Sequence, residues 1–130
     1  MMKSKFLTLL VLPVAALSLV AGRPLQRPTM WHLHLLKSEP AANDTLHAAP
    51  AAIRLWFSSA PEMAITTVHL TTAAGAPVAV GHATRDTSAT APVVAQVTGP
   101  VAPGAYVVEW RTSAADGHMS AGRIPFVVGH

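Results

Sequence analysis

Proline most limits what this chain can fold into. Eleven prolines are spread along its 130 residues, and the alanine-rich stretches that would otherwise favour helix lie beside Pro40, Pro50, Pro61, Pro92 and Pro103. Proline has no amide hydrogen and its ring clashes with the preceding helical turn, so no uninterrupted window of helical spacing remains. We therefore expect at most a single helical turn.

Short apolar or alternating runs lie between these breaks and predict β-strands. In residues 53–58, Ile53, Leu55 and Phe57 share one face, which is the pattern of a half-buried strand. The other expected strands are residues 34–38, 65–71, 77–80, 93–97, 105–112 and 123–128, with turns at 73–75 and 103–104. Seven strands in about 100 residues predict a single all-β domain of the sandwich type.

The start of the chain has the three parts of a secretory signal. Lys3 and Lys5 form a basic start, an apolar run of 16 residues extends from Phe6 to Ala21, and small residues lead to Gly22. We therefore expect an exported protein. The run is shorter than the roughly 20 residues that span a bilayer, so we expect no stable membrane insertion.

Three segments organise the chain: residues 1–22 as the signal peptide, 23–31 as a linker or part of the leader, and 32–130 as the folded domain. Four of the nine basic residues but none of the six acidic ones precede this domain, which leaves five positive charges against six negative. No cluster of Lys or Arg remains to bind phosphate, which argues against a nucleic-acid partner.

The chemistry of the residues excludes several kinds of site. The chain has no cysteine, which excludes disulfides, thiolate zinc sites and cysteine nucleophiles. Ser113, His118 and Ser120 are close in sequence, yet nothing places a hydroxyl, an imidazole and a carboxylate in relay order. A glycine-rich phosphate loop is also absent. We therefore do not expect an enzyme.

Two short motifs carry the candidate metal ligands. Asp116-Gly117-His118 lies near the end of the chain, and His32-x-His34 begins the domain. In an extended segment, residues i and i+2 point to the same face, so each motif can present two side chains to one ion. The alternative for Asp116-Gly117 is an ordinary turn, in which Asp116 accepts backbone N–H bonds. Nitrogen and carboxylate donors without sulfur suit tetragonal Cu(II). The remaining histidines, His47, His69, His82 and His130, are expected to be ordinary surface or hydrogen-bonded residues.

Four blocks of the sequence together resemble the CopC-type periplasmic copper resistance family. They are His-Leu-His-Leu-Leu-Lys-Ser-Glu-Pro-Ala at 32–41, Ile-Arg-Leu-Trp-Phe-Ser at 53–58, Gly-Ala-Tyr-Val-Val-Glu-Trp-Arg at 104–111 and Ala-Asp-Gly-His at 115–118. The last block is the most specific, and the resemblance covers nearly all of residues 32–128. It implies a small periplasmic protein with a Greek-key, immunoglobulin-like β-sandwich that binds Cu(II).

The resemblance also implies a ligand set and a role. The ligands are His32, Asp116 and His118, where the leading histidine of the mature protein binds through its free amine and its ring. His34 is an auxiliary candidate, either as a further ligand, as a partner that orients one, or as an ordinary strand residue. The implied role is a monomeric carrier or sequestering protein in copper resistance and homeostasis, with an inner-membrane copper transporter as its candidate partner.

The sequence departs from the family pattern at three places. Trp31 precedes His32, so a free amine on His32 needs an unusual cut, whereas cleavage after Gly22 leaves a site of imidazoles and Asp116 alone. The glutamate of the family's Phe-Ser-Glu strand is replaced by Ser59. The five methionines show no loop-like spacing, which argues against a dedicated Cu(I) site.

Two other functions stay open from the sequence. One is a metal-free β-sandwich that serves as an accessory or adhesion module. The other is a copper-dependent oxidative enzyme, since monooxygenases that cleave polysaccharides also bind copper through an amino-terminal histidine brace. Copper titration separates the module from the binder, and reductant-dependent oxygen consumption identifies the enzyme.

Overall fold

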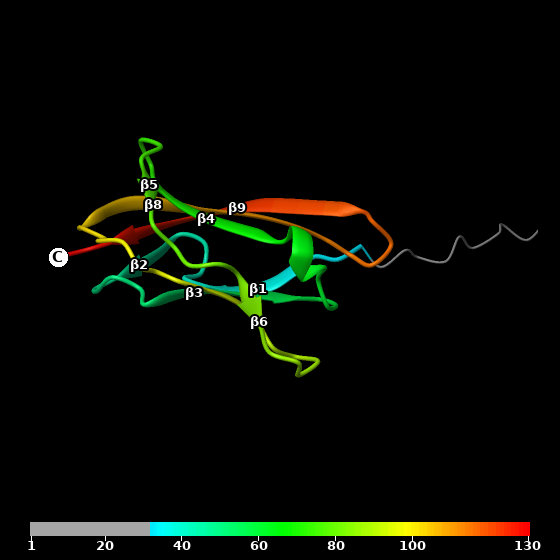
Figure 1. The fold of residues 1–130 in the computed structure, drawn as a ribbon. Coiled ribbons are helices and arrows are strands. Elements are labelled where there is room, and N and C mark those ends of the chain that lie inside the picture. Colours follow the sequence, from blue (N-terminus) through cyan, green and yellow to red (C-terminus); the bar gives the residue numbers. More distant parts are fainter. Residues whose placement is uncertain (1–31) are drawn as a thin grey trace, which may run out of the picture. The chain divides into compact units, whose positions relative to one another are not determined.

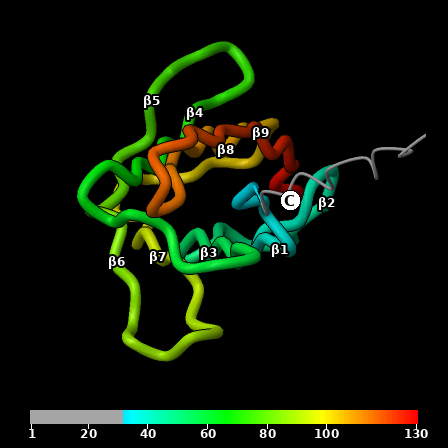
Figure 2. Tube along the Cα trace, turned by 90° about the vertical axis from the view of Figure 1, so that its right-hand side faces the viewer, coloured from blue at the N-terminus to red at the C-terminus, as the bar shows by residue number. Residues whose placement is uncertain are grey.

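The fold is an all-β sandwich, as predicted, in a computed structural model that describes residues 32–130. The expected signal peptide and linker therefore lie outside the described residues. One sheet has the order β1-β3-β7-β6 and the other β2-β9-β8-β4-β5, and they face each other as two layers (Figures 1 and 2). The strands are β1 (Leu35–Glu39), β2 (Asp44–Leu46), β3 (Ala52–Phe57), β4 (Thr67–Thr72), β5 (Pro77–Val78), β6 (Thr84–Arg85), β7 (Val93–Gln96), β8 (Gly104–Ser113) and β9 (Met119–Val128).

Seven of these strands match the expected ones, although the bounds differ by a few residues. The sequence reading missed β2 and β6, because runs of three and two residues are too short to show alternation. Ile65 was wrongly expected to begin a strand; it ends the 3-10 turn η1 (Met63–Ile65), and its N–H donates to the carbonyl of Glu62 at 3.2 Å. Within residues 32–130, no helix is long and apolar enough to cross a membrane.

The core lies between the two sheets and follows the predicted alternation. Ile53 and Leu55 of β3 and Val108 of β8 are fully buried. Trp110 of β8 packs edge-on against Phe57 of the opposite sheet, with ring centroids 5.1 Å apart, so it joins the two layers. Gly122 of β9 pairs with Trp110, and a side chain there would collide with the indole, since an added Cβ would lie 2.7 Å from three of its ring atoms.

Two features of the sheets position the loops at one end of the sandwich. Strands β8 and β9 pair without interruption from Gly104↔Val128 to Ser113↔Met119, so residues 114–118 form the loop of the hairpin. At the edge of the other sheet, β1 pairs with β3 and is interrupted by a bulge at Leu36. A bulge adds an unpaired residue and bends the strand, so it sets the direction from which the chain enters β1.

Candidate metal centre

The Asp116-x-His118 motif forms the tip of the β8–β9 hairpin. The N–H of Gly117 donates to the carbonyl of Ala114 at 3.0 Å, and the N–H of Ala114 donates to the carbonyl of His118 at 3.3 Å. Gly117 has φ of +85°, a backbone conformation that glycine adopts without steric cost. The extended geometry is therefore wrong for this motif, and the alternative of a turn is confirmed.

Hydrogen bonds, rather than strand alternation, bring the Asp116 and His118 side chains together. Oδ1 of Asp116 accepts the backbone N–H of His118 at 3.0 Å, and Oδ2 lies 2.9 Å from Nδ1 of the same residue. Because an ionised carboxylate can only accept, Nδ1 carries the hydrogen. The Nε2 atom of His118 then remains as the nitrogen that can bind a metal in the neutral ring.

The same contacts determine the charge of Asp116. The backbone N–H of His118, followed by its ring, holds the pKa of the Asp116 carboxyl below its usual value. Partial desolvation acts in the opposite direction, and the nearby charges of His118 and His32 add to the lowering. Asp116 is therefore an anion across the physiological pH range, and its oxygens retain lone pairs for a cation.

The segment that enters β1 meets this hairpin tip. His32 and His34 are exposed and flank Leu33, which is 3% exposed. This alternation confirms that the two histidines share a face. The rings of His32 and His118 lie in contact, with centroids 5.5 Å apart and planes at 88°. The start of the described chain thus meets the β8–β9 hairpin loop.

These contacts are pairwise and do not form a finished metal cage. Within residues 32–130, no three or more His, Cys, Asp or Glu side chains converge closely enough to hold an ion as they stand. Two imidazoles that bind one metal through nitrogen at about 2 Å place their centroids about 4.5 to 6.5 Å apart. The spacing of the His32 and His118 rings, 5.5 Å, fits that range.

His34 is held by contacts with the main chain around it. Its Nδ1 atom lies 3.0 Å from the carbonyl oxygen of His32, and its backbone N–H donates to Oγ of Ser58 at 3.0 Å. The sequence reading gave Ser58 no role beyond ending the expected strand at residues 53–58. The four histidines that were expected to be ordinary, His47, His69, His82 and His130, are all exposed.

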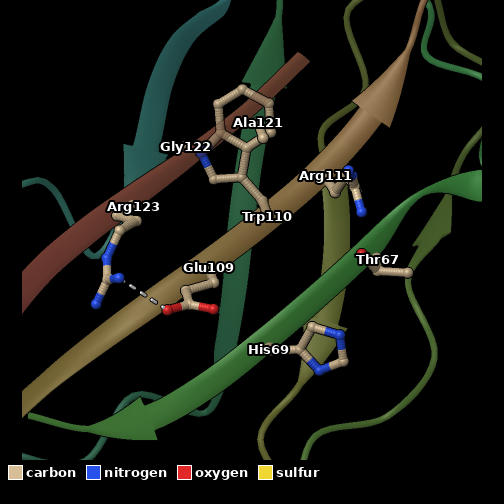
Figure 3. Close-up of a pocket in the computed structure, with 8 residues that line it drawn as sticks. All are labelled: Thr67, His69, Glu109, Trp110, Arg111, Ala121, Gly122 and Arg123. Atoms are coloured by element: carbon tan, nitrogen blue, oxygen red, sulfur yellow. Dashed lines mark ion pairs between the residues drawn. The ribbon is translucent and has the colours of Figure 1, made fainter. Parts of the chain in front are cut away.

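A separate hollow of about 500 Å³ lies on the five-stranded sheet (Figure 3). Its charged lining comes from the middle of β4, β8 and β9, where Arg123 pairs with Glu109 at 3.3 Å and His69 and Arg111 lie close by. None of the predicted ligands lines this hollow. The candidate metal centre is therefore formed by the tip of the β8–β9 hairpin and the segment that enters β1, and not by the hollow.

Comparison with known proteins gives a domain match and curated relatives. Residues 35–129 match the CopC domain. The protein YobA of Escherichia coli strain K12 is 31% identical over 102 residues, which cover 78% of this chain and 82% of YobA. YobA of Shigella flexneri has the same identity and coverage.

Solved structures give the same result. CopC from Methylosinus trichosporium OB3b aligns with a TM-score of 0.69 and 26% identity, covering 75% of this chain and 94% of that one. PcoC, a methionine-rich copper resistance protein from Escherichia coli, aligns with a TM-score of 0.64 and 28% identity, covering 75% and 98%. These relatives support the expectation that the chain is not an enzyme. With the domain match over most of its length, the chain belongs to the CopC family.

Proposed function

We propose that this protein is a periplasmic Cu(II)-binding protein that carries or sequesters copper. The observation that carries the proposal is the contact between the His32 and His118 rings beside the Asp116 carboxylate. His32, Asp116 and His118 would hold the ion, while His34 lies next to them. The copper resistance proteins among the structural relatives support copper as the cargo.

The donor set favours Cu(II) over Cu(I). The three side chains offer two imidazole nitrogens and one carboxylate, and such donors suit a tetragonal Cu(II) ion, whereas Cu(I) prefers thiolate and thioether sulfur. PcoC is described as methionine-rich. This chain has five methionines, and of the two in the described residues, Met63 is partly buried against the core whereas Met119 is exposed beside His118.

The location of the site suits transfer rather than permanent storage. His32, Asp116 and His118 are all exposed, so an acceptor protein can approach the bound ion directly. The negative charge of the Asp116 carboxylate offsets part of the positive charge of the bound Cu(II). An inner-membrane copper transporter is the partner that this arrangement fits best, and delivery would follow by exchange of ligands at the exposed rings.

A Cu(II) titration tests the proposal. The full chain should bind one Cu(II), and His118→Ala should weaken the affinity by at least about 100-fold because a ligand is lost outright, beyond the 10-fold to 100-fold typical of orienting partners. His82→Ala is the matched control, since His82 is exposed and lies elsewhere, and it should bind copper like the unaltered protein. Equal affinity in all three proteins would refute the assignment.

The same samples separate the two other functions. A metal-free module would show no stoichiometric copper uptake. A copper-dependent oxidative enzyme would consume oxygen when a reductant is added to the copper-loaded protein. We expect copper uptake without sustained oxygen consumption.

A further inference from the structure

The ladder between β1 and β3 ends in an irregular pair. The last regular pair is Leu35 with Phe57. In the next pair, the N–H of Ser58 donates to the carbonyl of His34 at 2.9 Å as in an antiparallel ladder. The N–H of His34, however, donates to the hydroxyl oxygen of Ser58 at 3.0 Å and not to its carbonyl. A side chain thus completes the last pair and fixes the backbone of His34.

The ring of His34 extends this fixation towards the site. Its Nδ1 atom lies 3.0 Å from the carbonyl oxygen of His32. A carbonyl oxygen can only accept a hydrogen bond, so Nδ1 is the donor and carries the hydrogen. The bond spans Leu33, whose side chain is buried. The backbone of His32 is therefore restrained by the His34 ring at its carbonyl and by the burial of the next residue, Leu33.

We propose that Ser58 and His34 are positioning residues that hold His32 against His118, and that His34 does not ligate the metal. Ser58 fixes the backbone of His34, the His34 ring fixes the carbonyl of His32, and the His32 ring then lies 5.5 Å from that of His118. The metal-binding part of this inference rests on the proposed copper function. The positioning part concerns the protein without metal.

Substitution at position 34 separates a positioning role from ligation. Asparagine carries its amide nitrogen at the same place as Nδ1 of histidine, whereas glutamine reaches to the place of Nε2. If His34 acts through Nδ1, His34→Asn should bind Cu(II) within about twofold of the unaltered chain, and His34→Gln should bind about tenfold more weakly, as for other partners that orient a ligand. Equal weakening in both variants would overturn the proposal.

Ser58→Ala removes the acceptor for the His34 N–H and should also weaken Cu(II) binding about tenfold. Ser59→Ala is the matched control, because Ser59 is the adjacent exposed serine, and its affinity should be unchanged. Thermal unfolding of all four variants shows whether each is folded.

A measurement without copper keeps this inference distinct from the copper function. Nuclear Overhauser effects between the ring protons of His32 and His118 should persist in His34→Asn and Ser59→Ala and disappear in His34→Gln and Ser58→Ala. Their persistence in Ser58→Ala would overturn the positioning role even if copper binds. Their disappearance in a protein that binds no copper would sustain the positioning role and refute the copper proposal alone.

Discussion

Replacing Gly122 by alanine should destabilise the sandwich by a magnitude that the structure allows us to work out. The added methyl would lie 2.7 Å from Cε2, Cζ2 and Nε1 of Trp110. The indole is only 7% exposed and packs against Phe57, so it has little room to move aside. Overpacking of this kind costs about 1 to 3 kcal/mol. For a domain of this size, about 2 kcal/mol corresponds to a fall in Tm of about 10 °C.

Urea denaturation followed by circular dichroism measures this change. If the slope of the unfolding free energy against urea concentration is the same in the variant and the unaltered protein, stability alone is altered. Gly81→Ala is the control, since a Cβ at that position comes no closer than 3.8 Å to any neighbour. It should change stability by less than about 0.5 kcal/mol. A Gly122→Ala protein as stable as the control would show that Trp110 is not fixed between the sheets, and the account of the core would fail.

Two other predictions concern the site. Lowering the pH from 7 to about 5 should release copper, because protons compete with the metal for imidazole and amine nitrogen; a flat profile would contradict nitrogen ligation. The Asp116 pKa is lowered, so the stabilisation of the hairpin by its carboxylate is fully present above the ordinary carboxyl pKa. This stabilisation is lost only as the pH falls through the lowered pKa, which lies below the pH range of copper release. If the amine is a ligand, the intact mass of the exported protein should correspond to a chain that begins at His32. A mass that corresponds to a start at Arg23 would leave only the side-chain donors and a lower copper affinity.

Long, alternating strands could be predicted from the sequence because burial imposes their pattern. Ile53 and Leu55 alternate with less buried residues, and the structure buries both completely. The β2 strand could not be predicted in this way, since Asp44, Thr45 and Leu46 show no alternation of their own. They form a strand because β9 offers them a parallel edge, which is a tertiary effect.

The candidate site was predictable to a similar degree. The short spacing of Asp116 and His118 correctly indicated that they interact, although a turn and not an extended strand achieves it. The meeting of His32 with His118 followed from the family resemblance, because no local pattern relates segments so far apart in sequence. The hydrogen bond to Ser58 was not predictable. Its hydroxyl accepts the His34 N–H in place of the carbonyl that a regular ladder would supply, and this happens only where the β1–β3 ladder ends.

The two halves of the site differ in what they need in order to exist. Asp116 and His118 are joined within one hairpin loop, whereas His32 reaches them only after the two sheets have packed together. A copper ion that both halves bind would therefore favour the native state over the unfolded chain by mass action. Resistance to unfolding would then rise with the free copper concentration, and the protein would be most durable when it is loaded with its cargo.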